Sequence, residues 1–124
     1  MANISFEING NIPPKKNSRI NLRNGVSIPS KRYKEWHLSS VKQIKSQLHD
    51  KTHLIPLNNL KYLYVVLYYD SLRRKDNSNT VESIHDLLVD CGVLVDDCWQ
   101  VTGVTIQKPI YRKNNAGALI TLRY

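Results

Sequence analysis

The stretch that most constrains the fold of this chain is residues 61–70, KYLYVVLYYD, where β-branched and aromatic residues follow one another almost without interruption. Such side chains favour extended backbone because they pack well on a pleated surface. A run that is apolar at nearly every position also predicts a strand inside a sheet, covered on both faces. We therefore expect a domain built around a central strand at residues 61–70.

Weaker patterns predict the elements around this strand. Apolar and polar residues alternate over residues 3–9, which is typical of a half-buried strand, and two more strands are expected at residues 99–111 and 117–124. Helices are expected from Ser30, a suitable N-cap, to Asp50, and from residue 80, after an Asn79 cap, to residue 91. Residues 15–23 are predicted to form a basic loop. The order predicts an α/β (α+β) fold, a mixed sheet with two main helices packed on it.

The size and composition favour one compact domain over residues 1–124. A chain of 124 residues can bury enough surface to fold without a disulfide, and Cys91 and Cys98 are expected to be reduced thiols rather than zinc ligands. The sequence contains no run of about 18 apolar residues and no leader-like start. We therefore expect no membrane contact and a cytoplasmic location, in a bacterial or phage-infected cell.

Charge is distributed unevenly along the chain. Residues 70–97 hold seven acids and three bases, a net charge of −4, whereas the remainder carries +12. A basic surface attracts the phosphate backbone of nucleic acids, but an acidic patch on the same protein would repel it. The conflict disappears if the carboxylates hold a divalent cation. The alternative is a solvated acidic helix face without a function.

The acidic groups flank the second predicted helix. Asp76 follows the central strand, and Asp96 and Asp97 follow the helix. Loops at strand ends are where scaffolds place reactive groups, and Mg²⁺ prefers carboxylate oxygens as ligands. Asp86 and Asp90 lie at i+4 intervals after Glu82, which is typical of a solvated acidic stripe.

An ordered set of residues in this region resembles the RusA family of Holliday-junction resolvases. The family pattern has a basic lead-in, an Asp-x-Asp-Asn segment, an Asp-x-Leu, a Gly and an Asp-Asp pair. The matching residues here are Asp76, Asn79, Asp86, Leu88, Gly92, Asp96 and Asp97. The N-terminal half is also similar to the family, at Gly10, Pro13, Pro14, Lys15, Lys16, Asn17, Tyr33 and Trp36.

The resemblance implies a homodimeric, Mg²⁺-dependent endonuclease, with Mn²⁺ able to replace Mg²⁺, that makes paired cuts in four-way DNA junctions and needs no small-molecule cofactor. It implies that Asp76 and Asp97 are metal ligands, with Asp96 a weaker candidate. A dimer with twofold symmetry would match the approximate symmetry of a four-way junction.

Two positions depart from the family pattern. Ser78 replaces the second Asp, and Glu82 replaces a helix Lys. Glu82 can supply the missing carboxylate while Ser78 offers a neutral oxygen, or Glu82 can form a capping box with Asn79. Lys75 or Lys16 is a candidate for the cationic role of the lost Lys. The alternative is a protein that binds junctions or other nucleic acids but cleaves weakly or not at all.

Seven basic residues are predicted to contact phosphates, which position DNA without reading its sequence. They are Lys15, Lys16, Arg19, Arg23, Arg73, Arg74 and Lys75.

Overall fold

The sheet that organises the protein has four strands in the order β1-β6-β4-β5. A computed structural model describes residues 2–14, 19–73 and 77–124. The strands are β1 (Asn3–Asn9), β6 (Gly117–Arg123), β4 (Tyr62–Tyr69) and β5 (Val104–Tyr111). β6 is antiparallel to both β1 and β4, whereas β5 is parallel to β4. The predicted α+β class, a single small domain with a mixed sheet, is confirmed.

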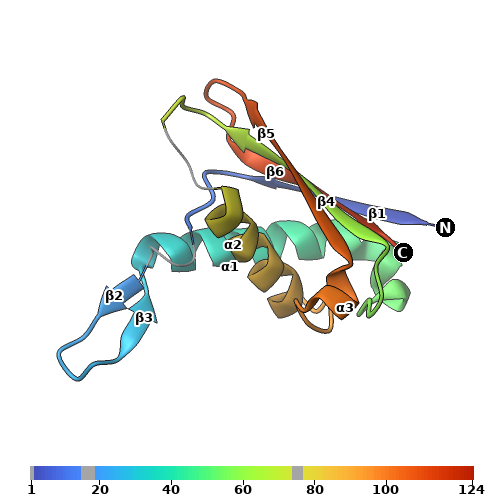
Figure 1. The fold of residues 1–124 in the computed structure, drawn as a ribbon, viewed down its shortest axis with the longest axis horizontal. Helices are drawn as coiled ribbons and strands as arrows, with labels where there is room; N and C mark the ends of the chain where they lie inside the picture. Colours follow the sequence, from blue (N-terminus) through green and yellow to red (C-terminus); the bar gives the residue numbers. More distant parts are fainter. Residues whose placement is uncertain (1, 15–18, 74–76) are drawn as a thin grey trace.

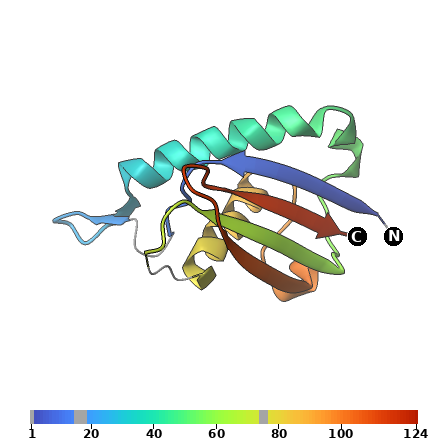
Figure 2. The same ribbon diagram turned by 90° about the horizontal axis from the view of Figure 1, so that it is seen from above.

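Both long helices cover the same face of this sheet. These are α1 (Lys31–Leu48), which continues into the 3₁₀ helix η1 (His49–Leu54), and α2 (Asn77–Asp90). Figures 1 and 2 show α1 and α2 together on one side, with the opposite face of the sheet left open. The core between the layers is formed by alternate strand residues and by one stripe of each helix, including Phe6, Ile44, Leu63, Val65, Leu67, Ile84, Leu87, Leu88 and Ile120.

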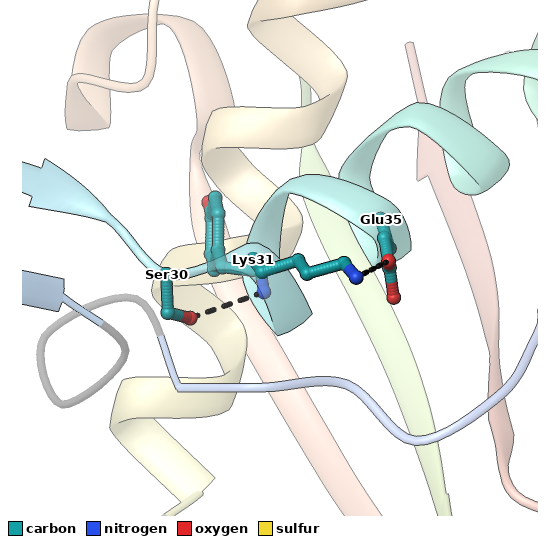
Figure 3. Close-up of polar contacts among 4 residues, drawn as sticks. Ser30, Lys31 and Glu35 are labelled. Carbon is teal, nitrogen blue, oxygen red and sulfur yellow. Dashed lines mark hydrogen bonds and ion pairs between the residues drawn. The ribbon is translucent and has the colours of Figure 1, made fainter.

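The predicted start of the first helix is confirmed. The Ser30 hydroxyl accepts a hydrogen bond from the Tyr33 N–H at 3.2 Å, which satisfies one of the free donors of the first turn (Figure 3). Lys31 and Glu35 form an exposed i,i+4 ion pair at 3.7 Å in the same turn. An exposed pair of this kind contributes little to stability, so the cap is the more informative signal.

The predicted loop at residues 15–23 is partly wrong. β2 (Arg19–Asn21) and β3 (Ser27–Pro29) form an antiparallel hairpin in which Ile20 faces Ile28. The hairpin extends beyond the first turn of α1 and away from the sheet in both views (Figures 1 and 2). Strands of three residues contain too few alternating positions to give a pattern, which is why the sequence indicated a loop.

Two boundaries near the acidic segment also differ from expectation. α2 begins at Asn77, so Asn79 lies inside the helix and cannot be its N-cap. Residues 99–102 form a short helix, α3 (Trp99–Thr102), and not the start of a strand. Gly103, with φ of 62°, separates α3 from β5 and lies against the backbone oxygens of Leu60 and Lys61. The expected cap at Gly92, after α2, is consistent with its φ of 76°.

The central position of β4 is confirmed, because it lies between β6 and β5. Its expected cover on both faces is wrong within the monomer. Leu63, Val65 and Leu67 are fully buried beneath the helices. On the other face Val66 is buried among its neighbours, but Tyr62, Tyr64 and Tyr68 are only partly buried. The neighbouring edge strand adds Val104 and Ile106 to this face, 65% and 43% exposed. The aromatic run therefore reflects an apolar surface rather than a second covering layer.

Candidate functional site

α2 provides the crossover between the parallel strands β4 and β5. Parallel neighbours require such a connection, because the chain has to return to the end of the sheet at which the first strand began. Val81, Ile84, Leu87 and Leu88 are 5% exposed or less and anchor the helix to the sheet. This anchoring fixes the direction of the remaining side chains, and Glu82 and His85, three residues apart, lie on neighbouring surface positions.

His85 lies between α2 and the edge of the sheet. Its Nε2 is 3.3 Å from the Thr105 hydroxyl on β5, and the ring is partly buried. Burial lowers the pKa of His85 below its ordinary value, while the charges of Asp97 and then Glu82 act in the opposite direction and raise it. The electrostatic influence of both carboxylates thus reaches the same imidazole.

Backbone hydrogen bonds fix the loop that carries Asp97. The Leu57 N–H donates to the Val93 carbonyl at 2.8 Å, and the Val95 N–H donates to the Leu57 carbonyl at 3.1 Å. Leu94 in this loop is almost completely buried. Asp97 follows as an exposed residue just before α3, so it is held in place by its neighbours while its carboxylate faces solvent.

Asp96 differs from Asp97 in how its carboxylate is used. Its Oδ1 accepts a hydrogen bond from the Asp97 N–H at 2.7 Å. This local bond is a common turn interaction of aspartate, and it occupies one of the four lone pairs of the carboxylate. Asp97 is accordingly the better candidate ligand of the pair.

The other predicted metal-site residues lie at the start of α2. Asp76 and Lys75 are outside the described residues, so their place in the cluster stays a prediction. Ser78 lies in the first turn of α2, but its side chain is outside what the structure describes. Glu82 is exposed in the second turn. The alternative capping-box role for Glu82 is wrong in the form expected, because Asn79 is not the cap.

The predicted phosphate contacts fall in separate parts of the molecule. Lys15, Lys16 and Arg74 are outside the described residues. Arg19 belongs to β2, and the exposed Arg23 lies at the tip of the same hairpin. Arg73 lines a hollow of about 300 Å³ at the carboxyl ends of β4 and β5, together with Tyr69, Ser71, Leu72, Pro109, Ile110 and Tyr111.

Sequence reasoning missed two groups of residues. His85 was not singled out, although its position one turn after Glu82 is a usable signal. Asp86 and Asp90 were expected to form a solvated stripe, but Asp86 accepts a hydrogen bond from the Tyr33 hydroxyl and Asp90 pairs with His37. Their partners lie more than 50 residues earlier, and no local pattern could have identified them.

A comparison with protein-family models gives no match, and a comparison with curated proteins gives none either. In the described ranges, no helix is both long enough and apolar enough to cross a membrane.

Proposed function

We propose that this protein is a Mg²⁺-dependent endonuclease that resolves four-way DNA junctions by paired nicks, acting in the cytoplasm during DNA recombination and repair. The proposal rests on one observation above all. Glu82 on α2 and Asp97 in the following loop are both exposed, and the charges of both oppose the lowering of the His85 pKa by burial, which supports an acidic region around this histidine in a protein whose net charge is +8.

The donor set fits a hard divalent cation. Carboxylate oxygens on exposed side chains leave room for the waters that Mg²⁺ retains, and Mn²⁺ accepts the same ligands. Asp97 and Glu82 would hold the ion, with Asp76 and Ser78 as further candidates from the start of α2. When bound, the ion supplies an activated water and stabilises the charge that develops on a phosphodiester.

The chain's own residues have separate tasks in this account. Asp97 is positioned by the Leu57-anchored loop, and Glu82 by the buried stripe of α2. Lys75 remains the candidate cation beside the scissile phosphate. The hairpin carrying Arg19 and Arg23 extends away from the sheet (Figure 1), which suits contacts with DNA backbone at a distance from the cut.

A homodimer is part of the proposal, because two cuts in a junction require two carboxylate sites. The open face of the sheet is the surface we assign to the contact between protomers. It presents Tyr62, Tyr64, Val104 and Ile106, and the guanidinium of Arg112 lies 3.5 Å over the Tyr68 ring. A twofold axis through this face would bury apolar side chains that the monomer leaves exposed.

A second candidate function is junction binding without cleavage. It is supported by Ser78 in place of a carboxylate and by the local hydrogen bond of Asp96, which together weaken the ligand set.

The test uses a labelled synthetic four-way junction and a linear duplex of the same sequence. Paired symmetric nicks with Mg²⁺, lost on addition of EDTA, are the expected result. A shifted junction band without nicks would favour the second candidate. Equal affinity for the linear duplex, or cutting of RNA, would contradict recognition of branched DNA altogether.

A further inference from the structure

A polar cluster between α1 and α2 takes no part in the site described above. Two residues one turn apart on α1, Tyr33 and His37, face two residues one turn apart on α2, Asp86 and Asp90. The Tyr33 hydroxyl donates to Asp86 Oδ2 at 3.0 Å, and His37 Nε2 lies 2.9 Å from Asp90 Oδ2. The two helices are thus joined by two polar contacts in register.

These side chains line a hollow and are not spread over an open surface. Its volume is about 400 Å³, and its walls are Pro29, Tyr33, Lys34, His37, Leu38, Val41, Asp86 and Asp90. The His37 side chain is only 21% exposed, and its Nδ1 is buried without a hydrogen-bond partner among the described residues. The hollow therefore contains a partly desolvated imidazole beside two carboxylates.

The three potential ligand atoms lie close together. One nitrogen of His37 and one carboxylate oxygen each from Asp86 and Asp90 all lie within 4.8 Å of one another. Two carboxylates at this separation repel each other. Lys34 is a cation on the wall of the same hollow. A divalent ion between the three atoms would balance both carboxylates.

We propose that His37, Asp86 and Asp90 form a binding site for a divalent transition-metal ion of the Zn²⁺ type, separate from the proposed nuclease centre. An imidazole with two carboxylates suits Zn²⁺ and its neighbours in the first row, whereas Mg²⁺ prefers oxygen ligands alone. Three protein ligands leave a fourth position for water or for a group of a bound molecule.

Tyr33 acts as a positioning residue for this site. Its hydroxyl holds the Asp86 carboxylate, and its ring stacks on His37 with centroids 5.8 Å apart and an angle of 18°. Such outer contacts fix the orientation of the ligands before the ion binds.

The site is distinct from the carboxylates of the proposed nuclease. Asp86 and Asp90 contact side chains of α1. His85 instead contacts β5, and the charges of Asp97 and Glu82 oppose the lowering of its pKa by burial. Because metal binding can be measured without DNA, a failure here would leave the proposed nuclease untouched, and the reverse also holds.

Isothermal titration of the EDTA-treated protein with Zn²⁺ tests the proposal. We expect a binding event that His37→Ala removes and that His49→Ala/His53→Ala, which deletes the exposed i,i+4 histidine pair of η1, retains. Asp97→Asn should retain it as well. Tyr33→Phe should weaken the affinity about tenfold.

Circular dichroism checks that each variant is folded. Asp90→Asn removes a second proposed ligand, because it replaces the carboxylate by an amide of nearly the same size. The proposal is overturned if the parent binds no Zn²⁺. It is equally overturned if folded His37→Ala and Asp90→Asn bind Zn²⁺ as the parent does.

Discussion

Replacing Tyr33 by Phe removes one hydroxyl and tests the contact between the two helices. That hydroxyl donates to Asp86 at 3.0 Å in a partly buried setting. A hydrogen bond to a charged acceptor contributes about 1.5–3 kcal/mol, and partial exposure places this bond at the lower end. The free energy of unfolding of a small protein falls by about 2 kcal/mol per M urea. A substitution that lowers this free energy by about 1.5 kcal/mol therefore lowers the urea concentration at the unfolding midpoint by about 0.7 M.

The assay is urea unfolding followed by circular dichroism in metal-free buffer, for Tyr33→Phe, Asp86→Asn and the double variant. Because Tyr33→Phe removes the donor of this bond and Asp86→Asn removes the charge of its acceptor, their losses should not add, and we expect a coupling of about 1 kcal/mol. Tyr111→Phe, at the exposed end of β5, is the matched control and should change stability little. Additive losses, or an equal loss in Tyr111→Phe, would refute the reasoning.

Three further predictions concern the titration of a histidine, a close backbone approach and the affinity for DNA. Burial lowers the pKa of His85 below 6.5, so the unfolded chain takes up more protons as the pH falls below that value, and the free energy of unfolding decreases. Between about pH 6.5 and pH 5, the free energy of unfolding of His85→Gln should fall less than that of the parent. Urea unfolding at several pH values will measure this difference. Gly103→Ala should lower the free energy of unfolding, measured in urea, by about 1–2 kcal/mol more than Gly25→Ala does. Both glycines have positive φ, but only at Gly103 would the new Cβ lie 2.6 Å from a backbone oxygen. Reversing the charge of Lys15 and Lys16 should weaken junction binding and reduce the slope of log affinity against log salt by about two, as filter binding at several salt concentrations will show.

The sequence predicted the elements whose patterns are long and local. The apolar run at residues 61–70 identified the central strand, and Ser30 identified the start of α1 because capping depends only on neighbours in the chain. The buried stripe of α2 followed from its helical spacing. The hairpin at residues 19–29 and the short α3 were missed because three or four residues carry too little periodicity.

The candidate site shows the same limit. Asp97 and Glu82 were identified from the sequence, but their common neighbour His85 depends on how the loop anchored by Leu57 folds back beside α2. The contacts of Asp86 and Asp90 with α1 were missed for a related reason, because they depend on the packing of two helices far apart in sequence. Spacing along one helix cannot indicate which side chain of another helix lies opposite.

The proposed nuclease depends on Asp97 holding the catalytic ion, and one measurement tests this most directly. Single-turnover cleavage of a four-way junction in Mg²⁺ is compared for the parent, Asp97→Asn, and the control Asp50→Asn, which alters an exposed acid in η1. We predict that Asp97→Asn binds the junction as the parent does yet makes no cuts, while Asp50→Asn cuts normally. Cleavage by Asp97→Asn at the parent's rate would contradict the assignment of the metal site.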